Sequence, residues 1–304
     1  MNQQFMLLVS LHMRNGNEGN EDMIKNDSLG DRMKTYENVT RTHLTRRTPV
    51  IIRIDGKAFH TFTRGFFKPF DVVLVKSMQD TMKYLCENIE GCVLGYTQSD
   101  EITLVLCDYK KLTSQAWFNN NIQKMCSISA SMATLEFNRK FTDNKDQWLM
   151  NTRNDMYINE NTFDEEAFDK MVQDKNVYDN SESHGAMFDS RVFNIPKEEV
   201  NNCLIWRQQD ATRNSIQSVA QANFSHKQLQ NKNCSELQEM LLQEKGINWN
   251  DIPTHLKRGS CCIKEQYEIE TEDGVALRSR WIIDEEIPIF SQDTSYVNSR
   301  IIFE

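Results

Sequence analysis

Two segments limit most strongly what this chain can fold into. One is an apolar strand that ends on a carboxylate, and the other is a short hairpin that carries two more carboxylates. Residues 50–60 read VIIRIDGKAFH, a β-branched run that stops at Asp55 and Gly56. Residues 95–106 read GYTQSDEITLVL, two strands around a turn with Asp100 and Glu101. A buried strand does not readily hold a charge, so acids at strand ends indicate a site. Carboxylates of this kind suit divalent metal that holds polyphosphate.

The elements around these segments predict an α+β fold. After the first strand, Asp71 is placed to cap a helix that ends near Asn88. A two-stranded hairpin, a second helix and one more strand follow; the ranges expected are Cys92–Thr97, Ile102–Cys107, Ser114 to about Asn138, and Asp189–Ile195. This order is that of a ferredoxin-like polymerase or cyclase palm, an antiparallel sheet with helices on one face. In such a sheet Asp55 and Asp100 face one another across a site open to solvent.

Apolar spacing predicts which helix faces are buried. On the first helix the stripe is Val75, Met78, Met82, Leu85 and Ile89; on the second it is Phe118, Met125, Ile128, Met132 and Leu135. A shorter helix is expected within Asp27–Val39. A polar helix is expected to start at Pro196 and to include residues 206–214. A capping box of Ser235 and Gln238 is expected to open a helix that ends at Gly246.

Polarity divides the chain into four segments. Residues 1–25 are expected to be a disordered extension, and residues 26–139 the palm core with the metal and nucleotide site. Residues 140–188 read as an acidic insertion with one short helix around Phe163–Val172. Residues 189–304 supply the last palm strand, a helical region and a C-terminal hairpin of Gly259–Tyr267 and Val275–Ile283.

Charge and cysteine content narrow the class of protein. The net charge is −9, which argues against a protein that coats nucleic acid with its whole surface. Residues 25–68 hold ten Lys/Arg against four Asp/Glu, an excess of +6 that leaves −15 for the rest. One basic region on an acidic chain suits selective contact with a polyanion. The eight cysteines lack zinc-site spacing and predict buried reduced thiols. No signal peptide or membrane span is expected, so the expected location is the cytoplasm.

Several motifs, taken together, resemble the tRNA-His guanylyltransferase family, and most closely its bacterial and archaeal guanylyltransferase-like branch of 3′-to-5′ RNA polymerases. They fall between about residues 27 and 265. The matching pieces are RIDGKAFH, KPFD, GYTQSDE, WF with a lysine on the second helix, FDSRVFNIP, WRQQD and LKRGS. The resemblance implies a palm-like core that binds nucleoside triphosphate with two Mg²⁺ ions and adds nucleotides to the 5′ end of tRNA. It also implies ATP and GTP as ligands and a homotetramer.

The resemblance implies roles for particular residues. Asp55, Asp100 and the Gly56 carbonyl match metal ligands, and Glu101 matches a catalytic acid beside them. The nucleotide-binding positions implied are Asp55, Gly56, Lys57, Ala58, Phe59, His60, Lys68, Ser99, Asp100 and Lys124. The tRNA contacts expected are Arg41, Arg46, Arg47, Arg207, Arg213 and Asn214.

One departure bears on the substrate. The branch dedicated to tRNA-His carries His-Ile-Asn-Asn after the WRQ-x-D motif, where this chain has Thr212, Arg213, Asn214 and Ser215. The departure favours templated repair of 5′-truncated tRNA, after activation of the 5′ end with ATP or GTP, over obligatory guanine addition to tRNA-His.

Four alternatives stay open. The chain could be a dedicated tRNA-His guanylyltransferase. It could keep the palm and act as a nucleotide cyclase or forward polymerase, against which the WRQQD and LKRGS matches speak. It could be an inactive tRNA-binding protein, against which Asp55, Asp100 and Glu101 speak. A purely structural role is the last alternative.

Overall fold

The computed structural model describes residues 28–155, 157–159, 162–163, 165–271 and 274–302, and divides the chain into two units. The first unit, Met1–Arg41, contains helix α2 (Leu29–Asn38), in which the Ser28 side chain caps the Asp31 amide. The predicted disordered extension, residues 1–25, lies outside the described residues. The second unit, Thr42–Glu304, holds everything that follows.

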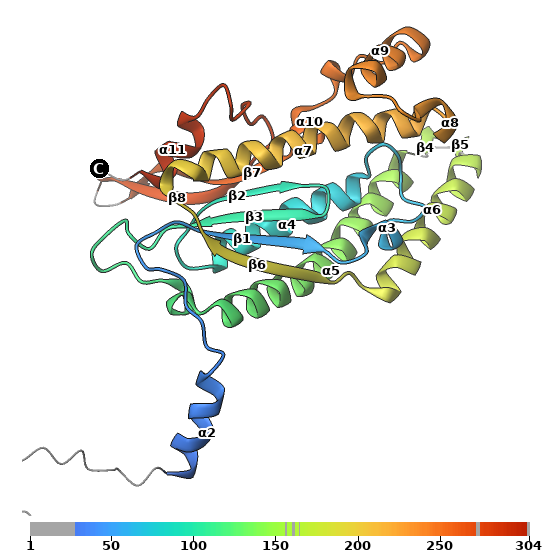
Figure 1. Cartoon of the computed structure of the whole chain (residues 1–304). Helices are drawn as coiled ribbons and strands as arrows, with labels where there is room; N and C mark the ends of the chain where they lie inside the picture. Colours follow the sequence, from blue (N-terminus) through green and yellow to red (C-terminus); the bar gives the residue numbers. More distant parts are fainter. Residues whose placement is uncertain (1–27, 156, 160–161, 164, 272–273, 303–304) are drawn as a thin grey trace, which may run out of the picture. The chain divides into compact units, whose positions relative to one another are not determined.

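Six antiparallel strands form the sheet of the second unit, in the order β6-β1-β3-β2-β7-β8 (Figure 1). Their bounds are Val50–Gly56 (β1), Cys92–Gln98 (β2), Glu101–Leu106 (β3), Phe188–Asn194 (β6), Ser260–Thr271 (β7) and Gly274–Asp284 (β8). A separate pair is β4 (Tyr157–Asn159) with β5 (Thr162–Phe163). The order β6-β1-β3-β2 is the ferredoxin-like arrangement that the sequence predicts, and β7–β8 is the predicted C-terminal hairpin, longer than expected.

Helices cover both faces of this sheet. Their bounds are Phe59–Phe62 (α3), Val72–Asn88 (α4), Ile122–Asp155 (α5), Glu165–His184 (α6), Lys197–Asn223 (α7), His226–Leu229 (α8), Cys234–Lys245 (α9), Thr254–Arg258 (α10) and Ser295–Ile301 (α11), with short 3-10 turns at Trp117–Asn120 and Trp249–Asp251. Helices α4 and α5 pack on the face that carries Ile52 and Ile54, and α7 and α11 pack on the face that carries Ile51 and Val105. The predicted palm has helices on one face only, which α4 and α5 provide. In the structure the C-terminal helical region also covers the other face.

The first helix and its cap follow the prediction closely. Asp71 accepts a hydrogen bond from the Leu74 amide at 2.9 Å, and α4 runs from there to Asn88. Met78, Met82 and Leu85 are fully buried on its inner side. The position of this helix places the end of the preceding loop beside the sheet.

The start predicted for the second helix, Ser114, is wrong. Phe118, Asn119 and Asn120 have φ angles of 50°, 52° and 58°, a left-handed conformation that a right-handed helix cannot contain. The α5 helix therefore begins at Ile122, with the Asn121 side chain accepting from the Lys124 amide at 3.0 Å.

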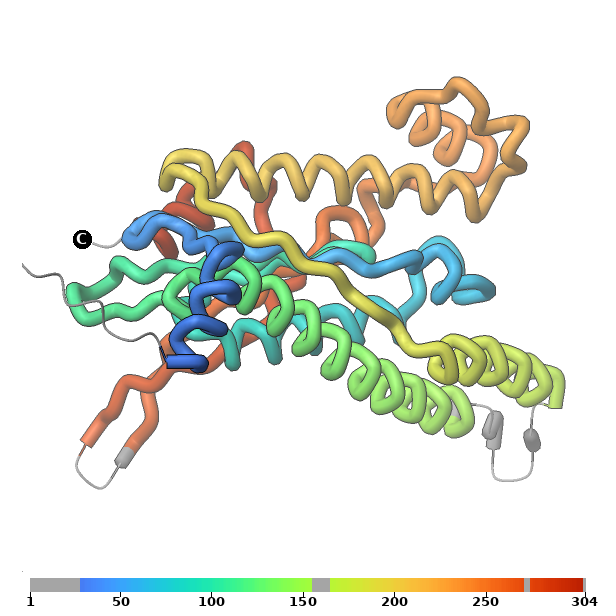
Figure 2. Tube along the Cα trace, turned by 60° about the horizontal axis from the view of Figure 1, so that its bottom comes forward, coloured from blue at the N-terminus to red at the C-terminus, as the bar shows by residue number. Residues whose placement is uncertain are grey.

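The inner face predicted for this helix is also partly wrong. Ile128 and Leu135 are exposed, as is Phe118 in the turn before α5, whereas the buried positions include Met125, Ser129 and Phe137. Ser129 can lie inward because its hydroxyl is hydrogen-bonded to the hydroxyl of Ser190 on β6, at 2.7 Å. Figure 2 shows α5 running along β6.

The 140–188 segment contains far more helix than predicted. The α5 helix continues to Asp155, and α6 covers Glu165–His184 instead of one short helix around Phe163–Val172. The two helices contact one another, and the buried Lys145 of α5 pairs with Asp179 and Glu182 of α6. Contacts of this kind stabilise a helix that has little apolar periodicity of its own.

A further correction concerns the helix before Gly246. Its capping box is formed by Asn233 and Glu236, two residues earlier than the predicted Ser235 and Gln238. Gly246 ends it as predicted, with a φ of 68°. All eight cysteines are free and five of them are buried, as the sequence predicts. Within the described ranges, the helices are too short or too polar to cross a membrane.

Candidate active site

The first strand and the hairpin tip meet as the sequence predicts. Asp55 of β1 is the cross-strand partner of Glu101 at the start of β3. The Gly56 amide donates to the Asp100 carbonyl at 3.1 Å, which ties the end of β1 to the turn. Asp55 and Asp100 are therefore neighbours at one end of the sheet.

A row of three acids crosses the sheet at this end. Asp55 pairs in register with Glu101 on one side and with Asp189 of β6 on the other, and cross-strand partners in an antiparallel sheet point to the same face. Asp189 is a neighbour of Asp55 that sequence reasoning missed, and we treat it as a candidate site residue. The available signal was the FDSR segment, because a strand that pairs antiparallel with β1 places its first residues beside the last residues of β1.

The electrostatics at Asp100 fit a bound cation. Burial raises the pKa of the Asp100 carboxyl, and the nearby carboxylates of Asp55 and Glu101 raise it further, against a hydrogen bond from Ser99 (3.0 Å) that lowers it. Crowded carboxylates of this kind are relieved by a divalent ion. No group of three His, Cys, Asp or Glu residues arranged for metal was found in the part of the chain that the structure describes. The fit therefore depends on two carboxylates, Asp55 and Asp100, with the Gly56 carbonyl.

Glu101 has a different environment from the other two acids. It is buried, forms an ion pair with Arg53 at 2.9 Å and accepts a hydrogen bond from Arg207 of α7, also at 2.9 Å. The Trp206 ring lies against the Arg207 guanidinium, 3.5 Å from the ring centroid. This placement favours a role for Glu101 in fixing α7 to the sheet over direct contact with a reacting group.

Arg207 is accordingly not on the surface. Only 4% of it is exposed, and its charge is neutralised by Glu101 with help from Asp210. The expected tRNA contact from this residue does not agree with its burial.

The residues after Asp55 form a tight turn over an aromatic cluster. A Cβ at Gly56 would lie 2.2 Å from the Phe59 ring, so only glycine fits there. The Phe59 ring packs against Phe62, Phe137 and Phe188 and is 5% exposed. Its expected nucleotide contact can therefore come from its backbone and not from its ring. Lys57, Ala58 and His60 are the other expected positions here; Lys57 and His60 are exposed, and Ala58 lies between Lys57 and the buried Phe59.

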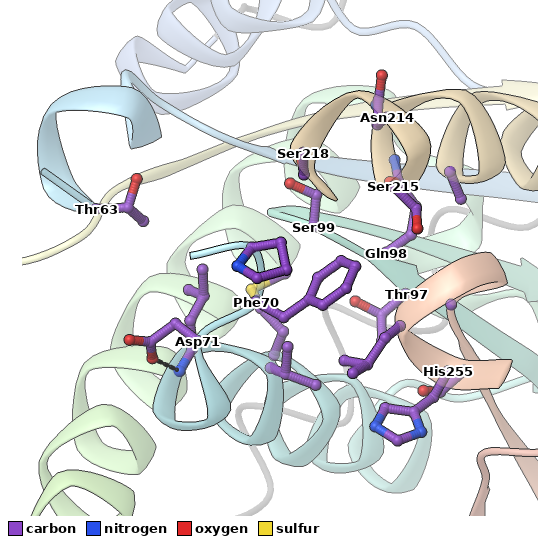
Figure 3. A pocket seen from close by; sticks show the side chains of 18 of the residues that line it. Thr63, Phe70, Asp71, Thr97, Gln98, Ser99, Asn214, Ser215, Ser218 and His255 are labelled. Atoms are coloured by element: carbon purple, nitrogen blue, oxygen red, sulfur yellow. Dashed lines mark hydrogen bonds between the residues drawn. The ribbon is translucent and has the colours of Figure 1, made fainter. Parts of the chain in front are cut away.

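A cavity of about 250 Å³ adjoins the hairpin tip. The loop before α4, the tip of β2, α7 and the α10–β7 junction line it, and among the expected site residues it includes Lys68, Ser99 and Asn214. Figure 3 shows the Phe70 ring among these elements, with Ser99 of the β2–β3 turn and Asn214 of α7 across from it. An aromatic ring beside a lysine suits a nucleotide base and its phosphates.

Helix α6 holds one wall of this cavity. The Tyr178 hydroxyl donates to Asp71 at 2.8 Å, and Asp71 in turn accepts from the amides of Phe67 and Leu74. Burial is the main cause of the raised pKa of Asp71. Tyr178 is a contact that the sequence did not indicate, because the segment around it reads as a polar insertion.

The structure does not bring every expected residue to this end of the sheet. Lys124 lies near the start of α5, beside the Phe118 ring. That end of α5 lies against Val192 of β6. Val192 is the cross-strand partner of Ile52, which is three residues along β1 from Asp55 and toward the opposite end of the sheet. The expected triphosphate contact of Lys124 is therefore not supported within this chain.

The remaining basic positions have separate surroundings. Arg46 pairs with Asp108 at 2.7 Å, and Arg47 donates from its backbone to the same carboxylate. Arg213 pairs with Asp210 on α7. Arg41 follows α2 in the first unit and contacts Asn38 there.

Comparison with known proteins identifies the family. A sequence model of tRNAHis guanylyltransferase matches residues 30–196. Two solved structures of a bacterial tRNAHis guanylyltransferase-like protein are similar to this chain. The complex with ATP is 45% identical with a TM-score of 0.71, covering 91% of this chain and 100% of that one; the complex with GTP is 43% identical with a TM-score of 0.66, covering 90% and 98%.

A viral relative extends the similarity. An uncharacterised protein of Acanthamoeba polyphaga mimivirus is 29% identical over 294 residues, which are 92% of this chain and 90% of the viral one. The matched family region contains Asp55, Asp100 and Asp189, the acids at the sheet end. This chain belongs to the tRNAHis guanylyltransferase family and is a nucleotidyltransferase.

Proposed function

We propose that this chain adds nucleotides in the 3′-to-5′ direction to the 5′ end of tRNA and thereby repairs truncated 5′ ends on a template. The observation that carries the proposal is the meeting of Asp55 and Asp100 at the sheet end, next to a cavity that holds Lys68 and Phe70. The similarity to bacterial proteins solved with ATP and with GTP supports nucleoside triphosphates as ligands.

The proposed reaction begins with activation of the RNA. A 5′-monophosphate is a poor electrophile, so its oxygen first attacks the α-phosphorus of ATP or GTP, which forms a nucleotidyl cap and releases pyrophosphate. An RNA that already has a 5′-triphosphate does not need this step. The 3′-hydroxyl of the incoming nucleotide then attacks the 5′ phosphorus, and the nucleoside monophosphate or pyrophosphate leaves. No side chain of the protein becomes covalently modified.

Particular residues of the chain have proposed roles in this reaction. Asp55, Asp100 and the Gly56 carbonyl would hold Mg²⁺, which when bound lowers the pKa of a hydroxyl and neutralises phosphate charge. Lys68 binds the nucleotide phosphates as a point charge. Phe70 and the loop before α4 orient the base. The homotetramer that the resemblance implies is part of the proposal and can be measured by light scattering after size-exclusion chromatography.

The residues that depart from the dedicated tRNA-His branch support repair over obligatory guanine addition. They lie within Thr212–Ser215 on α7, where Asn214 keeps the asparagine of that branch; of the changed residues, Ser215 lines the cavity beside Asn214. Ser215 also accepts a hydrogen bond from the Trp249 indole at 3.0 Å. A changed cavity wall is where a changed choice of nucleotide or template would arise.

The test compares two RNA substrates under the same conditions. Purified protein with Mg²⁺, ATP and the four nucleoside triphosphates is given 5′-labelled tRNA that lacks its first nucleotide, and separately full-length tRNA-His. Extension of the truncated tRNA by the nucleotide that matches the template supports repair. A single guanine added only to tRNA-His, whatever lies opposite, supports the dedicated guanylyltransferase. Extension of neither would contradict both.

A further inference from the structure

A second cavity lies on the other side of the residues that follow Asp55. It measures about 370 Å³ and lies between the Lys57–Arg64 segment and the C-terminal end of α6. Lys57 and Ala58, which come directly after Gly56, form part of its wall, so it adjoins the acidic end of the sheet. Its described lining residues are all different from those of the cavity that holds Lys68.

The charged side chains that line this second cavity, within the described part of the chain, are all basic. They are Lys57 and Arg64, and the imidazole of His184 lies beside them in the lining, although the chain as a whole has a net charge of −9. Among the described residues, the Lys57 ammonium and the Arg64 guanidinium make neither an ion pair nor a hydrogen bond. His184 uses Nδ1 for the Asn180 carbonyl, 2.7 Å away, which leaves Nε2 available.

Three acids of the surrounding elements have basic partners of their own, whereas Asp55, two residues before Lys57, has none among the described residues. Glu182 and Asp179 of α6 pair with the buried Lys145 of α5, and Asp179 also pairs with Lys175. Asp189, two residues after the lining residue Met187, pairs with Arg191 at 3.3 Å. Lys57 and Arg64 therefore have positive charges that no ion pair within the described residues neutralises, and such charges attract anions.

Hydrogen bonds to backbone carbonyls fix the two walls. The Lys57 amide donates to the Met187 carbonyl at 2.8 Å, and the buried Ser181 hydroxyl donates to the Phe62 carbonyl at 2.6 Å. The loop after β1 and the end of α6 are thus held together, and the cations project from a defined framework. Lys57, Arg64 and His184 are all exposed to solvent around this cavity, so an anion can reach them.

We propose that this cavity is a phosphate-binding site, in which Arg64 and His184, with Lys57, hold phosphate groups that extend from the Asp55 end of the sheet. Two sources supply such phosphates: the 5′ strand of the RNA, or the triphosphate of a nucleotide. The inference rests on the proposed function for the identity of these ligands, but the binding that it predicts does not require turnover.

The experiment measures binding of two probes to the full chain and to the double variant Arg64→Gln/His184→Gln. The probes are an RNA hairpin with a 5′-monophosphate, followed by fluorescence anisotropy, and ATP, followed by calorimetry. Removal of two side chains that bind phosphate is expected to weaken binding of one probe by about tenfold or more. If the RNA is the ligand, the slope of log Kd against log salt is expected to fall by roughly one for each cation that the substitutions remove.

Two controls separate charge from folding and from general electrostatics. Arg64→Lys keeps a cation and is expected to retain most of the binding that Arg64→Gln loses. Lys227→Gln removes an exposed charge of α8 that lines neither this cavity nor the one that holds Lys68, and is expected to change neither affinity. Thermal unfolding of each variant checks that the fold is kept.

The outcomes assign the ligand or overturn the site. Weaker RNA binding with unchanged ATP binding assigns RNA phosphates, and the reverse assigns the nucleotide. Equal affinities of the double variant and the parent for both probes would overturn the proposal. Weaker binding in a protein that transfers no nucleotide would contradict the proposed function and leave the phosphate site standing.

Discussion

At the level of single residues, the acids at the sheet end differ in what surrounds them. Asp55 and Asp100 have no basic partner among the described residues, and Asp100 is crowded by like charge. Glu101 lies between two arginines, Arg53 and Arg207, in a buried ion network. Three acids that look equivalent in the sequence are therefore expected to respond differently to substitution.

Glu101→Gln is expected to lower the free energy of unfolding by about 3 kcal/mol, because it leaves the partly buried Arg53 without its ion-pair partner and the buried Arg207 with only its longer contact to Asp210 (3.5 Å). Denaturant unfolding followed by circular dichroism measures this. The matched control is Glu265→Gln, which breaks an exposed pair with Arg280 (2.8 Å) and should cost less than about 1 kcal/mol. Equal losses in the two variants would show that Glu101 has no special structural role.

At the level of elements, α6 connects the 140–188 segment to the site. Tyr178 reaches Asp71 at the start of α4, and Ser181 reaches the Phe62 carbonyl of α3. Tyr178 also packs its ring against Phe66 and Trp148. Helix α6 thus braces the loop that carries Lys68.

Tyr178→Phe removes this brace with little change of shape. The loss of one buried hydrogen bond is expected to cost about 1 kcal/mol of stability and to raise KM for ATP by about threefold, while kcat changes little. Steady-state kinetics over a range of ATP concentrations measures the two constants. Tyr84→Phe serves as the control, since the Tyr84 hydroxyl makes no hydrogen bond among the described residues. An unchanged KM in Tyr178→Phe would mean that the loop holds its place without α6.

The α5–α6 ion network should make stability depend on pH. Partial burial raises the pKa values of Asp179 and Glu182, but hydrogen bonds from lysines outweigh it and lower them below 3.8 and 4.5. A lowered carboxyl pKa contributes stability that is present above the unfolded value and is lost as pH falls through the folded one.

Lys145→Met is therefore expected to lower the melting temperature at pH 7 and to differ less from the parent at about pH 3, where protonation of the two carboxylates has begun to remove their charge. Calorimetry at the two pH values measures the difference. Lys140→Met, which removes a half-exposed lysine with looser partners, is the control at both. A difference that is as large at the acidic pH as at pH 7 would place the effect in packing instead of charge.

What the sequence could predict also differs between elements. The strand Val50–Gly56 and the helix after Asp71 were predictable because local signals, a β-branched run and a capping aspartate, agree with their final contacts. The start of α5 was not, since it depends on three left-handed residues before Asn121. The length of α6 was not either, because that helix is stabilised by Lys145 and Asp71 from other elements.

At the level of the whole second unit, the site is assembled from parts that are distant in the sequence. Asp55 comes from β1, Asp100 from the β2–β3 turn, Asp189 from β6, and Asn214 from α7. The sequence motifs identified the first two, because each lies at the end of an apolar strand. The position of Asp189 beside Asp55 depends on the register of β6 on β1, for which the FDSR segment was the available signal, and the second cavity depends on the placement of α6.

The most direct test of nucleotidyl transfer at the sheet end is the rate of nucleotide addition by Asp55→Asn, measured together with RNA affinity. The expected result is a rate lower by about a hundredfold or more, with Kd for 5′-monophosphorylated RNA unchanged within about twofold. Asp143→Asn, which alters an exposed carboxylate on α5, is expected to keep both. A rate in Asp55→Asn equal to that of the parent would contradict the assignment of the active site to Asp55 and Asp100.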